Sequence, residues 1–263
     1  MPRDRLQVIG AAIQRSEIAW VRHYHRLDIS GDLVRPEVPT LFVANHGFGG
    51  IFDLNVFAVL AAFEELALDR PVTILVHKIA WTLGVGRLLE AIGAVPASAE
   101  AARRALAQGN HVLVFPGGDL DAFKARRDCD KILFAGRSGF ARLAIEAGVP
   151  IVPIATAGSG ETLFVLSDGQ WLARALRTDR LLRLKALPVT LSIPWGLNIG
   201  LVGLLPYLPV PAKLSSRVLR PMRPEAGETA AHFANRVSEV MQDALSELAV
   251  RRRASPPSAT ARH

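Results

Sequence analysis

The chain has 263 residues, of which 50% are hydrophobic and 21% are charged, and 31 Lys and Arg face 24 Asp and Glu for a net charge of +7. This composition excludes a disordered chain and collagen, and the single cysteine, Cys129, excludes a disulfide scaffold or a multi-cysteine zinc cluster. Because single α/β cores of this length are common, we expect one domain over residues 1–250.

Residues 1–20 carry charges on both sides of a short apolar stretch, so we expect no signal peptide. Strand and helix patterns then alternate. Short apolar runs predict buried strands at residues 40–44 (TLFVA), 72–76 (VTILV), 111–115 (HVLVF) and 149–155 (VPIVPIA). Stretches between them predict helices at residues 54–68, up to 92, 98–108 and 139–147. This alternation predicts an α/β fold with a largely parallel sheet and functional groups at the carboxyl ends of its strands.

Residues 186–212 carry no charge and are long enough to span a bilayer, but five prolines there argue against a membrane helix. Two interpretations stay open: short buried core strands, or an apolar wall or patch that faces lipid. Residues 228–250 repeat apolar side chains at helical spacing and predict a C-terminal helix.

Positive charge gathers at the C-terminal end. No acid follows residue 247, whereas four arginines supply +4 of the +7: Arg251, Arg252, Arg253 and Arg262. We therefore predict a disordered basic tail over residues 251–263. The body has neither a zinc-finger nor an RNP or basic-zipper pattern, so we expect no nucleic-acid partner.

The loop after residues 40–44 holds the first candidate reactive group. Its sequence, NHGFGGIFD, covers residues 45–53. His46 can accept a proton from a hydroxyl near neutral pH, and the Asp53 carboxylate could fix its tautomer and raise its basicity. Alternatively, His46 is only a loop residue and Asp53 only a helix cap.

A second candidate loop follows residues 111–115 and begins PGGDLD, residues 116–121. Its two glycines permit close backbone approach to a ligand, and basic residues beyond them could hold phosphates: Lys124, Arg126, Arg127, Lys131 and Arg137. Alternatively, neighbouring acids neutralise these cations, or Asp119 and Asp121 hold a metal as in nucleotide-sugar transferases. Nucleophile-elbow, dinucleotide and Walker A motifs are missing from the sequence.

Taken in order, these segments resemble the lysophospholipid/glycerolipid acyltransferase superfamily, and within it the monoacylglycerol and diacylglycerol acyltransferase branch. The resemblance covers residues 15 to 222 or so and rests on five blocks: VANHGFGGIFD, GAVPAS, VLVFPGGDLD, GRSGFARLAIEAGVPIVPI and GSGETLF. It implies a mixed, largely parallel sheet flanked by helices, with a C-terminal helix.

The resemblance also implies an O-acyltransferase that moves a fatty acyl group from acyl-CoA to a lipid hydroxyl, with His46 as general base and Asp53 orienting it. Acyl-CoA would be a co-substrate, and neither a cofactor nor a metal is implied. The residues implied in substrate binding are Asn45, Gly49, Gly50, Phe115, Pro116, Gly117, Gly118, Asp121 and Arg137. Backbone amides within residues 47–50, or those of Gly117 and Gly118, would stabilise the oxyanion.

Two departures from the family pattern refine these expectations. Six residues separate His46 from Asp53 where the family usually has four, so either Gly49 and Gly50 form a bulge or Asp53 is not the partner. Residues 115–118 (FPGG) lack the Glu, and the following residues the Arg, of phosphate-handling members, which favours a neutral glycerolipid or long-chain alcohol. Arg137 would contact the CoA phosphates or brace the glycine loop.

We further expect a cytoplasmic protein bound peripherally to the inner face of the membrane, through the uncharged stretch and the basic tail. Two alternatives remain on the same fold: a non-catalytic lipid- or acyl-binding protein, and an acyl-CoA thioesterase.

Overall fold

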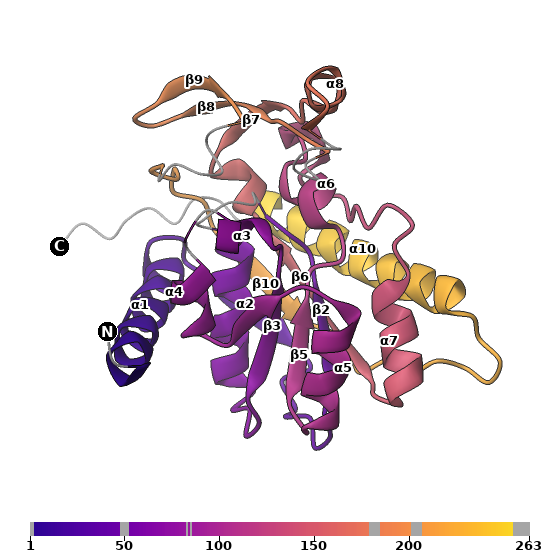
Figure 1. Ribbon diagram of the computed structural model, residues 1–263. Coiled ribbons are helices and arrows are strands. Elements are labelled where there is room, and N and C mark those ends of the chain that lie inside the picture. The colour runs from indigo at the N-terminus through magenta and orange to yellow at the C-terminus, as the bar shows by residue number, and fades with distance from the viewer. Residues whose placement is uncertain are drawn as a thin grey trace.

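A computed structural model describes residues 3–47, 53–82, 84, 86–178, 185–200 and 207–254. The strands form a seven-stranded sheet in the order β1-β10-β6-β2-β5-β3-β4 and a separate three-stranded sheet in the order β7-β8-β9. Figure 1 shows helices on both sides of the larger sheet and the smaller sheet standing away from it.

The larger sheet is mixed and mostly parallel, as predicted, with one antiparallel contact between β10 and β6. Its strands are β1 (Asp28–Gly31), β2 (Leu41–Ala44), β3 (Val72–Val76), β4 (Ala94–Pro96), β5 (His111–Val114), β6 (Ile151–Ala157) and β10 (Ser215–Val218). The central strands β2, β5 and β6 are buried along their whole length. Continuous apolar runs are typical of strands covered on both faces, which is why their sequences do not alternate.

Two cores lie on opposite faces of β2, because successive side chains of a strand point to opposite sides. Phe42 and Ala44 pack in the core that contains α1 and α2, whereas Leu41 and Val43 pack in the core that contains α5, α7 and α10. These helices are α1 (Arg3–His23), α2 (Leu54–Glu65), α5 (Ala99–Ala107), α7 (Gly139–Ala147) and α10 (Ala230–Ala254).

The helix boundaries follow local signals that the sequence contains. Ser98 caps α5 by accepting a hydrogen bond from the Ala101 amide, and Gly148 ends α7 with a φ of 65°. The helical stretch predicted up to residue 92 is divided into α3 (Ile79–Thr82) and α4 (Gly86–Glu90). Of the helices described, none is long and apolar enough to span a membrane.

The C-terminal helix is longer than its apolar repeat predicted, and it corrects the predicted tail. α10 continues to Ala254, so residues 251–253 are helical. The Arg252 side chain is 7% exposed and donates to both carboxylate oxygens of Glu161, and Arg253 pairs with Asp130. These long-range ion pairs hold the start of the predicted tail on the body, and residues 255–263 lie outside the described residues.

Within the described part of the uncharged stretch, residues 186–200 and 207–212, the strands do not lie in the buried core, which was one of the two interpretations. Its strands β8 (Val189–Ser192) and β9 (Gly196–Ile199) pair antiparallel and join β7 (Phe164–Ser167) in the smaller sheet. Many of its apolar side chains are exposed. Nearby short helices are α6 (Gly118–Ala122), η1 (Arg126–Asp128), η2 (Ser159–Glu161) and α8 (Gln170–Ala175).

A groove of about 550 Å³ lies between α1 and the chain around Tyr207, and Glu17 lines it. Burial raises the pKa of Glu17 from 4.5 to about 7, because the groove disfavours the charged carboxylate. Folding therefore binds a proton at this site between these two values, and the protein loses stability as the pH rises through that range.

Replacing Glu17 with Gln removes this penalty. We expect Glu17→Gln to raise the free energy of unfolding by roughly 1 kcal/mol at a pH above 7.5 and to leave it unchanged near pH 4, as measured by urea denaturation. An equal gain at both pH values would show that ionisation of Glu17 is not the cause.

Candidate active site

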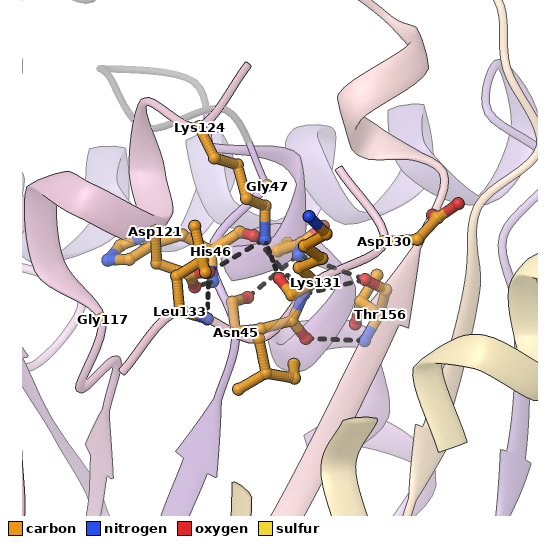
Figure 2. Close-up of polar contacts among 12 residues, drawn as sticks. Asn45, His46, Gly47, Gly117, Asp121, Lys124, Asp130, Lys131, Leu133 and Thr156 are labelled. Carbon is orange, nitrogen blue, oxygen red and sulfur yellow. Dashed lines mark hydrogen bonds and ion pairs between the residues drawn. The ribbon is translucent and has the colours of Figure 1, made fainter. Parts of the chain in front are cut away.

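The sheet order brings three loops together at the carboxyl ends of β2, β5 and β6, which are neighbours. Asn45 joins two of these ends: its side-chain amide donates to the Thr156 carbonyl (3.0 Å), and the Thr156 amide donates to its side-chain oxygen (2.9 Å). Asn55 of α2 donates to the Asn45 carbonyl (2.9 Å). Figure 2 shows Asn45 and Thr156 linked in this way beside His46. Asn45 was predicted to bind substrate. It is 1% exposed, and its hydrogen bonds connect the ends of β2 and β6 beneath the site.

His46 lies directly after β2 and is held by Asp53. Its Nδ1 lies 2.5 Å from one carboxylate oxygen of Asp53, whose other oxygen accepts from the amides of Gly47 (3.3 Å) and Asn55 (2.9 Å). The Asn55 contact caps α2. Asp53 therefore serves as helix cap and as histidine partner at once, and the alternative that it is only a cap is wrong.

The longer spacing between His46 and Asp53 does not prevent this contact. The predicted bulge at Gly49 and Gly50 lies outside the described residues. With Nδ1 facing Asp53, Nε2 is the ring nitrogen left to exchange a proton with a ligand. The His46 side chain is 20% exposed, whereas that of Asp53 is 5% exposed. The buried Asp53 therefore orients the imidazole of His46, and the imidazole itself stays partly accessible.

Two aromatic side chains complete the surroundings of this pair. The Phe115 ring stacks on the His46 ring with centroids 4.6 Å apart and planes 28° from parallel. Tyr207 is buried, and both burial and the negative charge of Asp53 raise the pKa of its phenol. Phe115 was predicted as a site residue because it lies in the FPGG block. Tyr207 was missed, since only the fold brings residue 207 near Asp53.

Asp121 holds the main chain of His46 by a hydrogen bond. One of its carboxylate oxygens accepts the backbone amide of His46 (2.7 Å), and the other accepts from Lys124 Nζ (2.9 Å) and the Leu133 amide (3.2 Å). Figure 2 shows these contacts converging on Asp121. Asp121 is fully buried and the Lys124 side chain is 4% exposed. Asp121, predicted near the acceptor, therefore lies beneath the loop with both oxygens bonded to the protein.

Arg137 braces the glycine loop, which is one of its two predicted roles. Its guanidinium donates to the carbonyls of Pro116 (2.8 Å) and Gly117 (2.5 Å). A Cβ on Gly117 would lie 2.1 Å from Asp121 Cβ, and Gly118 has a φ of +53°. Both glycines are thus required for the loop to close over Asp121 and Arg137. The Gly118 amide donates to the Phe115 carbonyl (3.3 Å).

The acids and cations of this loop mostly pair with one another. Asp119 contacts Arg137 and accepts the Lys185 amide, so its carboxylate is engaged separately from that of Asp121. Lys131 and Arg127 both contact Asp128. No group of three or more His, Cys, Asp or Glu side chains suited to a metal ion occurs among the residues that the structure describes.

With this geometry established, comparison with known proteins identifies the family. The sequence model named Acyltransferase matches residues 26–157, about half of the chain. The chain belongs to the acyltransferase family. The matched residues run from the end of α1 to the end of β6 and include His46, Asp53 and the glycine loop. The predicted resemblance to the glycerolipid acyltransferase superfamily is confirmed.

Relatives of this acyltransferase-family chain include bacterial and animal proteins. An "uncharacterized protein" of Mycobacterium tuberculosis is 31% identical over 185 residues, which are 70% of this chain and 50% of the relative. The human diacylglycerol O-acyltransferase 2-like protein 6 is 26% identical over 63% of this chain and 52% of its own. A chicken protein named DGAT1/2-independent enzyme synthesizing storage lipids is 30% identical over 51% of this chain and 40% of its own. The chain spans about half the length of the curated relatives it matches.

The fold itself also occurs in a solved structure of the superfamily. The 1-acyl-sn-glycerophosphate acyltransferase PlsC from Thermotoga maritima aligns with a TM-score of 0.55 over 94% of this chain and 79% of its own. At 16% identity this similarity shows the fold alone. It confirms the predicted glycerolipid acyltransferase-like architecture.

The buried pair beneath His46 can be tested by its effect on stability. Asp121→Asn leaves Lys124 buried without its carboxylate, so we expect the free energy of unfolding to fall by about 3 to 5 kcal/mol. The double variant Asp121→Asn with Lys124→Met should lose less than the single variant, because no uncompensated charge remains.

Urea denaturation followed by circular dichroism measures both losses. Lys131→Ala is the matched control, because its ion pair with Asp128 is 60% exposed on the lysine side and is expected to contribute less than about 1 kcal/mol. A double variant less stable than Asp121→Asn would contradict the burial argument.

Proposed function

We propose that this chain transfers a fatty acyl group from acyl-CoA to the hydroxyl of a lipid, with a neutral glycerolipid or a long-chain alcohol as the favoured acceptor. The observation that carries the proposal is the hydrogen-bonded pair of His46 and Asp53 in a chain of the acyltransferase family. A buried carboxylate on Nδ1 fixes the tautomer that leaves Nε2 free to act as a base.

The reaction then proceeds in two proton transfers. Nε2 of His46 accepts the proton of the acceptor hydroxyl while its oxygen attacks the thioester carbonyl, forming a C–O bond. The tetrahedral intermediate expels CoA thiolate as the C–S bond breaks, and the imidazolium returns the proton to sulfur. Asp53 stabilises the transient imidazolium, and neither an acyl-enzyme nor a metal is required.

The glycine loop supports a neutral acceptor. Residues 115–118 lack the Glu that phosphate-handling members carry, and the guanidinium of Arg137 is engaged with the carbonyls of the loop. Lys124 and Lys131, which could have held phosphate, face Asp121 and Asp128. These three cations of the loop are thus paired with groups of the protein, which supports an acceptor without a phosphate. The human relative's name contains diacylglycerol and the chicken relative's name contains storage lipids, and both names support a neutral lipid acceptor.

The donor and the location complete the proposal. A thioester supplies the activated carbonyl, and acyl-CoA is the proposed carrier; an acyl carrier protein would present the same bond. We place the chain in the cytoplasm, peripheral to the inner face of the membrane, because its acceptor is dissolved in lipid. Gly49 and Gly50 are proposed to bind substrate, and backbone amides within residues 47–50 are proposed to stabilise the oxyanion.

Thiol release from palmitoyl-CoA, with and without a panel of mono- and diacylglycerols, long-chain alcohols and lysophospholipids, tests this function. We expect release that depends on a neutral acceptor, and a loss of about 100-fold to 10,000-fold in His46→Ala, because general-base catalysis contributes that much. Palmitoyl carrier protein in place of palmitoyl-CoA identifies the donor.

Two variants separate catalysis from stability. Asp53→Asn keeps a side chain that caps α2 but removes the carboxylate from His46, so turnover should fall while thermal unfolding changes little. Ser98→Ala removes the cap of α5, remote from the site, and should lower stability by about 1 kcal/mol with normal turnover. Release without acceptor would instead identify a thioesterase, and acyl-CoA binding without release a non-catalytic protein.

A further inference from the structure

The smaller sheet has its polar and apolar faces reversed. On β8 and β9 the polar side chains point inward, where Thr190 donates to Asn198 (3.0 Å) and Asn198 donates to Ser192 (3.1 Å). Thr190 is fully buried and Ser192 is 7% exposed. A sheet with one face in water normally presents its polar side chains to that water. Here the hydrogen-bonded polar row lies against the protein.

The apolar side chains occupy the opposite face. Phe164 lies opposite Leu191, and Leu191 lies opposite Leu197, so the three form a row across β7, β8 and β9. They are 43%, 47% and 67% exposed, and Ile199 beside them is 52% exposed. Because cross-strand neighbours share a face, these side chains form a continuous apolar surface. Such a surface marks a contact with another apolar phase rather than with water.

Aromatic and basic side chains lie at the margin of this surface. Trp195, in the turn between β8 and β9, is 46% exposed. The guanidinium of Arg126 lies 5.0 Å from the centroid of the Phe164 ring. Arg126 therefore presents a positive charge at the edge of the apolar row. Tryptophan at an apolar margin and arginine beside it suit the boundary between lipid chains and headgroups.

We propose that the exposed face of β7, β8 and β9 binds a bilayer surface with anionic headgroups, the apolar row entering the acyl region and Arg126 meeting phosphate. This inference rests on the proposed function, which needs access to a lipid acceptor. Figure 1 shows the small sheet and α8 on the same side of the molecule as α6, which follows the glycine loop. A lipid surface bound there would lie on the same side of the molecule as the glycine loop.

Charge favours a membrane over a second copy of this chain as the occupant. Among the described residues between 162 and 212, three are cationic (Arg174, Arg177 and Lys185) and one is acidic (Asp168). Two copies facing each other through this region would bring like charges together, whereas an anionic headgroup layer neutralises them. The occupant is therefore a negatively charged lipid surface.

Flotation with phosphatidylcholine vesicles, with and without phosphatidylglycerol, tests the surface. We expect Leu191→Ser with Leu197→Ser to weaken partitioning about tenfold or more, because both side chains lose apolar area that would leave water. The matched control is Val34→Ser with Val250→Ser, since these valines are 75% and 63% exposed elsewhere on the chain. It should partition within about twofold of the wild type.

The charge contribution has its own pair of variants. Arg126→Gln should reduce the gain in binding that phosphatidylglycerol brings and leave binding to pure phosphatidylcholine unchanged, because only the anionic lipid contributes charge. Arg142→Gln, on an exposed position of α7, should change neither. Equal effects of the two arginine variants would overturn the role of Arg126.

Three further outcomes decide the inference. Unchanged flotation of the double leucine variant overturns it. A wild-type dimer in light scattering that the leucine variant abolishes, with no difference in flotation, also overturns it and assigns the face to a second copy. Turnover of short-chain, water-soluble substrates should survive in the leucine variant. His46→Ala should bind vesicles normally but show no turnover. Vesicle binding by a wild-type protein that shows no turnover would refute the proposed function alone.

Discussion

The carboxylate of Asp53 accepts hydrogen bonds from a helix and from a loop at once. One oxygen caps α2 and holds the Gly47 amide, and the other lies 2.5 Å from His46 Nδ1. Since α2 packs in the core beneath β2, the position of the imidazole is fixed by the folding of that core. A change that moved α2 would move His46 with it. The reactive geometry is thus a consequence of helix capping.

A second buried carboxylate completes the support from the neighbouring strand. Asp121 holds the main chain of His46, and Lys124 compensates its charge out of contact with water. Burying two charges is costly, and such a pair contributes geometry more than stability. Gly117 has no side chain because Asp121 occupies that space. Glycine is therefore needed in the FPGG block, because the loop after β5 packs closely against Asp121, which holds the loop after β2.

The candidate active site and the small sheet differ in the polarity of the side chains that they expose. The active site is built from charged and polar groups that satisfy one another beneath a partly exposed histidine. The small sheet, in contrast, hides its polar groups and presents leucine, isoleucine and phenylalanine outward. The proposed function, which joins a water-soluble thioester to a lipid, requires both kinds of surface. Their separation on different strands lets each be formed without disturbing the other.

The amino-acid sequence alone determined the elements whose causes are local. Apolar runs marked β2, β3, β5 and β6, while Ser98, Asp53 and Gly148 marked helix ends through hydrogen bonds and backbone angles within a few residues. The motif order also indicated the family. Only the tertiary structure decided which partner each buried charge found and which faces of β8 and β9 lay against protein or were exposed. Those outcomes depend on contacts between residues far apart in sequence, and an uncharged apolar strand has the same local pattern whether its outer face meets a core or a membrane.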